Sequence, residues 1–432
     1  MTASHTQPNW RKTKLGDYFR IKHGYAFKGE FFSDEGPYVL LTPGNFQVDG
    51  GIKLKGEREK YYTGDFPKEF LLKRGDFLIV MTDLTQNAPI LGSPALIKED
   101  DKFLHNQRLG KIVELNESEM DRMFLYYLFN TTSVRAQIKA SATGATVRHT
   151  APDRIYAVKV EVPSLSIQRR IASILSAYDD LIENNTRRIK ILEEMARLIY
   201  REWFVEFRAP GVKLRKAAPE EQKVMGKDVF PVGWEVKRVG DAIETLGGST
   251  PSTKNPEYWD NGDITWFTPS DLTANKAMFI RDSSKKITRL GLEKSSSRLF
   301  PPYSVMMTSR ATIGVTAINT TEACTNQGFI TCIPNDRLSA YHIYFWIEQN
   351  LDQIVNVASG ATYKEINRTE FRDFLIAVPD EATASQFVEV VGPMGRQIEI
   401  LQAKNANLRQ TRDLLLPKLV SGEVEVEKLS IG

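Results

Sequence analysis

The chain has 432 residues, of which 41% are hydrophobic, 26% charged and 10% aromatic, and its formal net charge at pH 7 is +3. This length and composition are typical of a globular protein with two domains, and no stretch approaches the roughly 18 apolar residues that a membrane span requires. The first ten residues, MTASHTQPNW, lack the apolar region of a secretory signal. We therefore expect a cytoplasmic protein whose mild charge permits a polyanionic partner without requiring one.

An internal repeat with a period of about 220 residues organises the chain. Trp10 with LGD (15–17) recurs as Trp234 with VGD (239–241), and further segments recur in the same order. They are GPYVLLTPGNF (36–46) with GDITWFTPSDL (262–272), VMT (80–82) with MMT (306–308), HNQRLGKIV (105–113) with TNQGFITCI (325–333), LYYL (125–128) with IYFW (343–346), and GAT at 144–146 and 360–362. The chain therefore contains two copies of one unit, joined head to tail.

Each copy begins with short apolar and aromatic runs separated by Gly, Pro, Asn and Asp, a pattern typical of strands and turns with a helix or two. The runs DFLIVMT (76–82) and YSVMMT (303–308) follow turn residues and predict buried strands. The fold class that we expect is α+β, with two similar strand-rich domains.

Each copy ends in a long helix that begins after a proline, Pro163 in the first copy and Pro379 in the second. Apolar residues then recur every three or four positions, which indicates an amphipathic helix with one apolar seam. The first seam includes Ile182, Asn185, Ile189, Leu192 and Ile199, and the second includes Ile398, Leu401, Asn405, Leu408 and Leu415. The asparagine in each seam either fixes the register of a helix pair or marks a solvated point where the helix frays.

Some forty helical residues extend about 60 Å, which is longer than a domain needs for its own core, so we interpret both helices as spacers. The segment between the copies is rich in Pro, Gly and charge, as in a linker. The expected boundaries are 1–163 for the first strand-rich domain, 164–207 for its helix, 208–232 for the linker, 233–379 for the second domain, 380–421 for its helix and 422–432 for a tail.

Three phrases carry a resemblance to a known family. ENNTRRIKILEEMARLIYREWFVEF (183–207) resembles the central helix of the specificity (S, or HsdS) subunit of type I restriction-modification enzymes. PVGWEVKRVGD (231–241) resembles the opening of its second recognition domain, and LRQTRDLLLPKLVSGEVEV (408–426) resembles its C-terminal helix. Because the phrases occur in the family's order and the resemblance covers nearly the whole length, we identify the chain as resembling this subunit.

The resemblance implies two target-recognition domains, each of which reads half of a split site in double-stranded DNA. Two long antiparallel coiled-coil helices would hold these domains apart with pseudo-twofold symmetry. It also implies two methyltransferase (M) subunits docked on the helices, and restriction (R) subunits that supply a motor and a nuclease. No cofactor is expected in this chain; S-adenosylmethionine is expected in the methyltransferase partner, and ATP and Mg in the restriction partner.

We expect no catalytic residue and no metal site in the chain. The histidines are scattered, Cys324 and Cys332 lack partners at zinc-ligand spacing, and no phosphate-binding GxxxxGK[ST] occurs. A DNA adenine methyltransferase needs Asn or Asp before a Pro-Pro-aromatic triplet, because that side chain accepts a hydrogen bond from the adenine amino group. The nearest match begins with Phe300, which cannot accept one.

Candidate DNA-binding residues lie in the polar loops. Arg pairs with guanine and Asn or Gln with adenine, whereas Lys, Arg, Ser and Thr hold phosphates. The candidates of the first copy are Thr82, Thr85, Gln86, Asn87, Gln107, Arg108, Arg148 and His149, and those of the second are Ser309, Arg310, Thr312, Asn326, Gln327, Tyr363, Lys364 and Asn367. The Asn-Gln pairs at 106–107 and 326–327 either cap a turn or contact DNA, and Arg148 and Lys364 either contact phosphates or are solvated.

Two other functions stay open on the residues alone. A coiled-coil scaffold for other proteins would explain the helices but not the duplicated domains, and a self-sufficient DNA methyltransferase would need the acceptor that Phe300 does not provide. The copies differ most at QNAPILGSPA (86–95) and ATIGVTAINT (311–320), which predicts two different half-sites.

Overall fold

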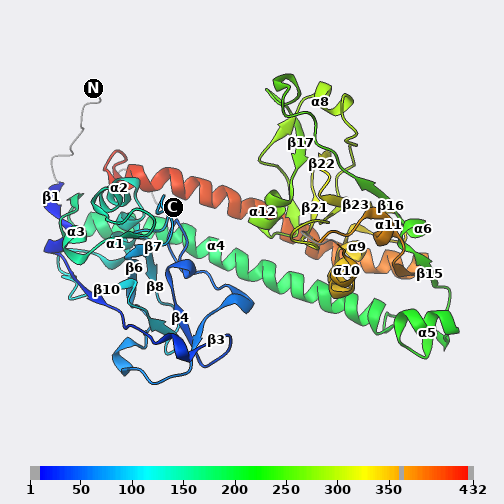
Figure 1. Cartoon of the computed structure of the whole chain (residues 1–432), viewed down its shortest axis with the longest axis horizontal. Coiled ribbons are helices and arrows are strands. Elements are labelled where there is room, and N and C mark those ends of the chain that lie inside the picture. Colours follow the sequence, from blue (N-terminus) through cyan, green and yellow to red (C-terminus); the bar gives the residue numbers. More distant parts are fainter. Residues whose placement is uncertain (1–9, 360–363, 427–432) are drawn as a thin grey trace. The chain divides into compact units, whose positions relative to one another are not determined.

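The computed structural model describes residues 10–359 and 364–426 (Figure 1). It divides into two compact units: unit 1 comprises residues 1–182 and 407–432, and unit 2 comprises residues 183–406. Helix α4 (Leu165–Tyr200) begins in unit 1 and ends in unit 2, and helix α12 (Glu381–Val420) begins in unit 2 and ends in unit 1. Each unit therefore contains parts of both long helices.

Unit 1 is closed by an antiparallel pair between its first strand, β1 (Arg11–Lys14), and its last, β12 (Lys159–Val162). Its other strands form a sheet in the order β2 (Arg20–His23), β10 (Leu109–Val113), β6 (Phe77–Val80) and β8 (Pro94–Leu96), a sheet in the order β3 (Phe32–Ser33), β5 (Tyr61–Tyr62), β4 (Tyr38–Leu41) and β9 (Phe103–His105), and the pair β7 (Thr82–Asp83) with β11 (Arg148–His149). The short helices are α1 (Arg122–Phe129), α2 (Thr132–Ser141) and α3 (Pro152–Tyr156).

Unit 2 is closed in the same way by β15 (Glu235–Arg238) and β24 (Leu375–Val378). Its sheets have the order β16 (Glu244–Gly247), β23 (Phe329–Ile333), β20 (Val305–Thr308), β21 (Thr316–Asn319) and β18 (Phe279–Ile280), and the order β19 (Lys286–Ile287), β17 (Ile264–Phe267) and β22 (Ala323–Thr325). The short helices are α6 (Val239–Ala242), α7 (Pro269–Asn275), α8 (Arg289–Glu293), α9 (Ala340–Gln349), α10 (Leu351–Val357) and α11 (Arg368–Arg372).

The repeat seen in the sequence recurs in the strand pairing. The antiparallel series β2–β10–β6 of unit 1 has its counterpart in β16–β23–β20 of unit 2, and the parallel pair β4–β9 has its counterpart in β17–β22. The buried strands predicted at 76–82 and 303–308 are confirmed as β6 and β20, in which every residue is buried. Mixed helix and strand content in two units agrees with the expected α+β class.

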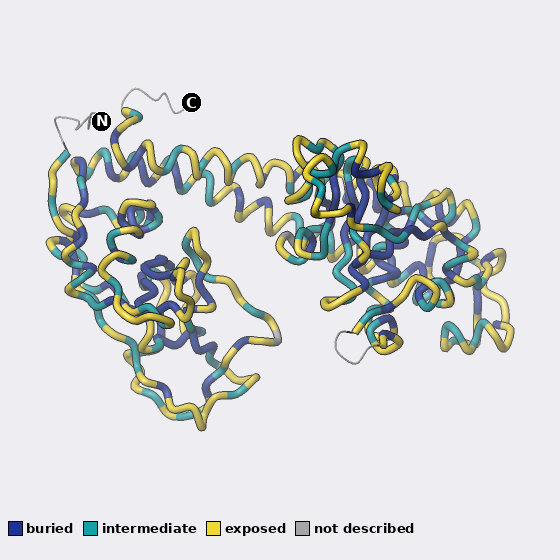
Figure 2. Tube along the Cα trace, turned by 45° about the horizontal axis from the view of Figure 1, so that its top comes forward, coloured by how far each residue is buried: buried dark blue, intermediate teal, exposed yellow. Residues whose placement is uncertain are grey.

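Each unit has a core to which the local parts of the long helices contribute. In unit 1 Phe124 of α1 and Ile171 of α4 share a cluster with Leu419 of α12. In unit 2 Phe204 and Phe387 share a cluster with the strands of the second copy. Figure 2 shows buried and exposed residues alternating along the long helices, as expected for one apolar seam on each.

The long helices begin where the prolines predict, and their ends differ slightly from the expectation. The first helix is α-helical as far as Tyr200 and continues as a π-helical turn, Arg201–Val205. Its start is fixed by the buried amide of Gln168, which donates to the carbonyl oxygens of Glu119 (2.8 Å) and Pro163 (2.9 Å). Within residues 10–359 and 364–426, no helix is both long and apolar enough to cross a membrane.

The two seam asparagines bind each other inside unit 2. The Nδ2 of Asn185 donates to the Oδ1 of Asn405 at 3.0 Å, and the Nδ2 of Asn405 donates to the hydroxyl of Thr186 at 3.2 Å. Both asparagines are buried, so neither marks a frayed point. Of the other predicted seam residues, Ile182, Ile398 and Leu401 are buried, whereas Ile189, Leu192, Ile199, Leu408 and Leu415 are partly buried.

The segment expected as a linker, 208–232, is folded. Strands β13 (Leu214–Lys216) and β14 (Val229–Pro231) pair antiparallel around helix α5 (Pro219–Met225). Phe230 is fully buried and packs edge-on against Phe207, with ring centroids 5.6 Å apart. Composition suggested a linker here, but apolar burial of this kind orders the segment.

We predict that Asn405→Ala destabilises unit 2 by about 1–3 kcal/mol, because the buried amide of Asn185 then loses its acceptor. Urea unfolding followed by tryptophan fluorescence measures this in unit 2, where every tryptophan except Trp10 lies. The exposed neighbour Lys404 provides the control, Lys404→Ala. Equal stability of the two variants would contradict the pairing.

A buried histidine links the stability of unit 2 to pH. His342 packs against the rings of Phe204 and Tyr200, with centroids 4.3 and 5.2 Å away, and its Nε2 has no hydrogen-bond partner in the described structure. Burial lowers the pKa of His342 to about 3. Below about pH 6.5 His342 is therefore protonated in the unfolded chain but stays unprotonated in the folded chain. The free energy of unfolding falls as the pH drops for this reason.

We expect the free energy of unfolding of unit 2 to fall by about 2 kcal/mol more in the wild type than in His342→Leu between pH 7.5 and pH 5. The reason is that only the wild type carries the group whose folded pKa is depressed. Urea titrations at both pH values measure the difference. Parallel pH profiles for the two proteins would refute the link.

Candidate nucleic-acid interface

In unit 1 the structure brings three of the predicted segments together at the end of strand β6. Thr82 stands opposite His149 in the β7–β11 pair, and its hydroxyl lies 3.0 Å from the Nδ1 of His149. The backbone N–H of Met81 donates to the carbonyl of Arg108 at 3.0 Å, which places the 106–108 turn beside the same strand end. Candidates that are far apart in the sequence thus lie at one strand end, where Thr82 is buried and His149, Gln107 and Arg108 are exposed.

A buried carboxylate shapes the loop that carries Thr85, Gln86 and Asn87. The Oδ1 of Asp83 accepts from the backbone N–H of Thr85 (2.9 Å) and from its hydroxyl (2.7 Å). The other oxygen of Asp83 accepts from the N–H of Ile90 at 2.9 Å. Gln86 and Asn87 are exposed at the tip of a loop whose backbone is held in place. Sequence reasoning did not single out Asp83.

The Asn-Gln pairs at 106–107 and 326–327 were expected either to cap a turn or to contact DNA, and the structure shows that both asparagines cap a turn. The Oδ1 of Asn106 accepts from the N–H of Arg108, and the Oδ1 of Asn326 accepts from the N–H of Gly328, both at 2.9 Å. Each asparagine therefore caps the same turn in its own unit. The residues that follow, Gln107 and Gln327, are exposed, and their contact with DNA stays a prediction.

The guanidinium of Arg148 is already engaged within unit 1. It donates to the carbonyl oxygens of Lys139 (3.0 Å), Ala142 (3.3 Å) and Gly144 (3.4 Å), and so ties β11 to the end of α2. Its counterpart in the prediction, Lys364, is exposed. Phosphate contact stays a prediction for both residues, and the geometry favours it more for Lys364.

In unit 2 the corresponding strand end carries an ion pair. The Nε of Arg310 donates to the Oε1 of Glu365 at 2.7 Å, and the two residues form an isolated antiparallel bridge. Ser309 is buried beside them, and the carbonyl of exposed Thr312 accepts from the hydroxyl of Thr308. Asn367 caps α11, since its Oδ1 accepts from the N–H of Glu370 at 2.9 Å. Tyr363 lies outside the described residues.

The strand register corrects one part of the repeat alignment. Val80 pairs with Leu109 in unit 1, and Thr308 pairs with Phe329 in unit 2. The match of VMT (80–82) with MMT (306–308) was therefore wrong: Thr82 corresponds to Arg310 and not to Thr308. The pair of Thr82 with His149 thus occupies the place of the ion pair of Arg310 with Glu365.

The residues considered above as possible catalytic or metal-binding groups have structural roles in unit 2. Phe300 of the proline tetrapeptide is buried, and the hydroxyl of Tyr303 donates to Glu399 at 3.2 Å. Burial raises the pKa of the Cys324 and Cys332 thiols to about 12, so both stay protonated at neutral pH. Among the described residues, no group of three or more His, Cys, Asp or Glu side chains could hold a metal ion.

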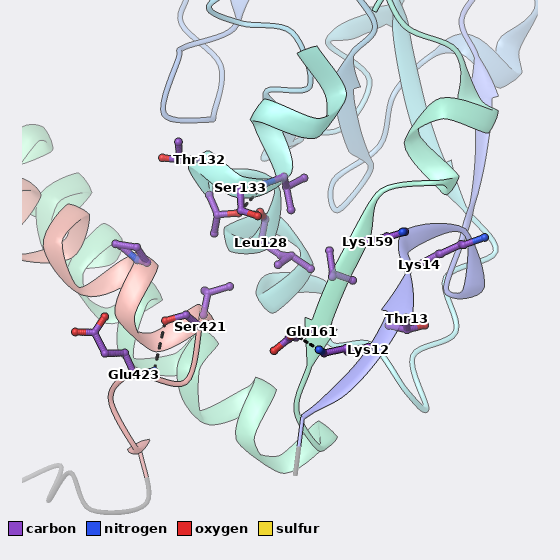
Figure 3. A pocket seen from close by; sticks show the side chains of 15 residues that line it. Lys12, Thr13, Lys14, Leu128, Thr132, Ser133, Lys159, Glu161, Ser421 and Glu423 are labelled. Atoms are coloured by element: carbon purple, nitrogen blue, oxygen red, sulfur yellow. Dashed lines mark hydrogen bonds and ion pairs between the residues drawn. The ribbon is translucent and has the colours of Figure 1, made fainter. Parts of the chain in front are cut away.

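A cavity of about 790 Å³ in unit 1 shares no residue with these loops. It lies between β1, β12, the start of α2 and the end of α12 (Figure 3). Lys14 stands directly opposite Lys159 on the two strands, whereas Lys12 lies 3.6 Å from Glu161. Like charges opposite each other destabilise a strand pair, so Lys14 and Lys159 gain nothing from facing each other here.

Comparison with known proteins was made for the whole chain. Residues 8–194 and 231–410 match the family described as the type I restriction modification DNA specificity domain. The chain is 28% identical to the specificity subunit of the type I restriction enzyme MjaIX of Methanocaldococcus jannaschii, over 80% of this chain and 78% of that protein. It is 24% identical to the HindI specificity subunit of Haemophilus influenzae, over 96% of this chain and 100% of that protein.

A solved structure shows the same fold. The S subunit of a type I restriction-modification system from M. genitalium superposes with a TM-score of 0.59 at 16% identity, over 97% of this chain and 99% of that one. The family match covers both copies of the repeat and most of each long helix. The chain therefore belongs to the type I restriction-modification DNA specificity family.

Proposed function

We propose that this chain selects the DNA site of a type I restriction-modification complex and carries out no chemistry itself. The observation that carries the proposal is the strand-end surface that recurs in both units, with a capped turn and an exposed glutamine in each. One scaffold that holds different side chains at one place is what two different half-sites require. A scaffold for other proteins would not need the repeated polar surface.

The long helices act as the spacer in this proposal. Each belongs to both units, and the 36 residues of α4 extend about 54 Å, more than the roughly 34 Å of one DNA turn. The pairing of Asn185 with Asn405 supports a fixed antiparallel coiled coil and, with the repeated strand order, pseudo-twofold symmetry between the units. The two units would then read the two halves of a split double-stranded site.

Because the chain would carry out no reaction itself, other subunits would have to supply methylation and cleavage. Two methyltransferase subunits would bring S-adenosylmethionine, and restriction subunits would bring ATP and Mg. An exposed apolar stripe on α4 supports docking of a methyltransferase: Ile191, Met195 and Leu198 are 53%, 43% and 49% exposed and lie at helical spacing. The complex would act in the cytoplasm, where DNA is accessible to it.

The proposed function predicts that the chain directs DNA methylation only when it is bound to its methyltransferase partner. With its methyltransferase partner, the complex should methylate one split sequence, and the isolated chain should transfer no methyl group. Replacing residues 234–379 with the same region of a relative should change one half of that sequence and leave the other half unchanged. Sequencing of methylated sites across a genome measures both results.

Methyl transfer by the isolated chain would refute the non-catalytic role. Changes in both halves after the graft would refute the modular role. The ungrafted complex, assayed in parallel, defines the original site and serves as the control for both experiments.

We also expect the double variant Ile191→Glu with Leu198→Glu to weaken methyltransferase binding at least about tenfold, because a buried unpaired charge costs well over 1.4 kcal/mol. Both side chains are half exposed in the free chain, so the fold should persist. Titration calorimetry measures the affinity, and Lys190→Gln, which changes the charge by the same amount per site, is the control. Unchanged affinity of the double variant would place docking elsewhere.

A further inference from the structure

A cavity of about 400 Å³ lies beside the Arg310–Glu365 pair of unit 2. It opens between the end of β16, the loop after α8, the turn that carries Gln327, and the start of α11. Two arginines that sequence reasoning did not single out, Arg298 and Arg368, line it together with Ser309 and Glu365. The cavity therefore extends the strand-end surface that the proposed function assigns to DNA.

The two arginines are available to a ligand. Both are exposed, and neither guanidinium has a hydrogen bond or an ion pair to any part of the chain that the structure describes. Glu365 is different, because its Oε1 already accepts from Arg310 at 2.7 Å. Two free forks of donors thus face the cavity next to a carboxylate that keeps its second oxygen, Oε2, for another donor.

Neighbouring hydrogen bonds anchor the backbone segments that carry the two arginines. The hydroxyl of buried Ser297 donates to the carbonyl of Ser249 at 2.9 Å, which anchors the loop just before Arg298. Arg368 is the first residue of α11 and follows the cap residue Asn367, whose N–H also donates to Glu370 at 3.0 Å. A site that is positioned in advance loses less freedom when a ligand binds.

Gly247 and Gly248 form one wall of the cavity, where the absence of side chains leaves space. A Cβ on Gly248 would collide with the carbonyl oxygen of Asn326, so this position requires glycine. A Cβ on Gly247 would lie 3.9 Å from the Nη1 of Arg368, which places this guanidinium beside Gly247. Gln327 completes the wall, and its Oε1 accepts from the hydroxyl of Thr250 at 2.6 Å, which leaves the amide N–H₂ to donate.

We propose that this cavity reads a G·C base pair in the half-site bound by unit 2, with Arg298 and Arg368 as specificity-determining residues. The proposal rests on the function proposed above. The major-groove edge of G·C presents the acceptors N7 and O6 of guanine and the amino donor of cytosine. The arginines supply the matching donors, and the free oxygen of Glu365 supplies the matching acceptor.

The carboxylate favours a base pair over a phosphate. A phosphate offers only acceptors and negative charge, so the two arginines would attract it but Glu365, which lines the same cavity, would have no donor to accept from. The amino group of cytosine, in contrast, is a donor that a glutamate accepts from. The mixed set of donors and one acceptor therefore matches a G·C edge better than the DNA backbone.

The described part of unit 1 differs at the positions equivalent to Glu365 and Arg368. The N–H of Thr150 donates to Met81 there, as that of Ile366 donates to Ser309 in unit 2. By this match, His149 of unit 1 is equivalent to Glu365 of unit 2, and Pro152 is equivalent to Arg368. A proline carries no donor, so the two units read their half-sites differently at this point.

The test uses the complex of this chain with its methyltransferase partner, with Arg298→Ala and Arg368→Ala each compared with the wild type. We expect each variant to relax the preference for G·C about tenfold at one position of one half-site, because one good base contact is worth about 1–3 kcal/mol. Methylated sites are mapped by sequencing, and binding to the wild-type site is measured over a range of salt. The control is Arg281→Ala, which removes an equal charge from an exposed position of the same unit and should leave the recognised DNA sequence unchanged.

Each outcome has one meaning. Weaker binding to all sequences alike, with a salt dependence reduced by about one ion, would assign the arginines to phosphates and overturn the proposal. Unchanged sites in both variants would also overturn it, while the proposed function would stand. A wild-type complex that methylates no defined split sequence would instead refute the proposed function.

Discussion

The antiparallel pairing of the first and last strands of each copy is the contact on which the rest of the structure depends. Arg11 stands opposite Val162 in unit 1, and Glu235 stands opposite Val378 in unit 2. In both units the long helix follows directly after the last strand. The strand pair therefore fixes where each long helix begins, and every loop between the two strands is held as part of one closed unit.

The closed units keep a constant backbone under changing side chains. Backbone hydrogen bonds of 3.0 and 3.1 Å hold the same crossing in the two units, from Thr150 to Met81 and from Ile366 to Ser309. These bonds depend little on the side chains beside them, so a Thr–His pair and an Arg–Glu pair can occupy the same place. Recognition can then diverge between the copies without loss of the fold, because loops on a rigid scaffold tolerate substitution.

The sequence predicts what rests on long or regular patterns. The helices were found because their apolar spacing persists over many turns. The strands β6 and β20 were found because a fully buried strand is a continuous apolar run after a turn. The error in aligning VMT with MMT arose because similar letters outweighed register, which is set by pairing to Leu109 and Phe329.

The candidate site was predictable only in part, for a related reason. Polar loops could be recognised by composition, and the turns at Asn106 and Asn326 by their repetition. Arg298 and Arg368 line one cavity although 70 positions separate them along the chain. The loop before Arg298 is anchored by a long-range hydrogen bond from Ser297 to Ser249, for which no local pattern exists. The folded segment at 208–232 was missed because its order depends on the burial of Phe230 against residues outside it.

The two described ends of the chain touch each other in unit 1. A Cβ on Gly422, which has a φ of +76°, would lie 3.2 Å from the indole nitrogen of Trp10, so the first strand starts where the last helix stops. Contact between ends makes a chain equivalent to a closed loop, in which the position of the opening matters little to the contacts. A gene rearranged to begin within another surface segment would therefore encode the same set of packed elements in a different linear order.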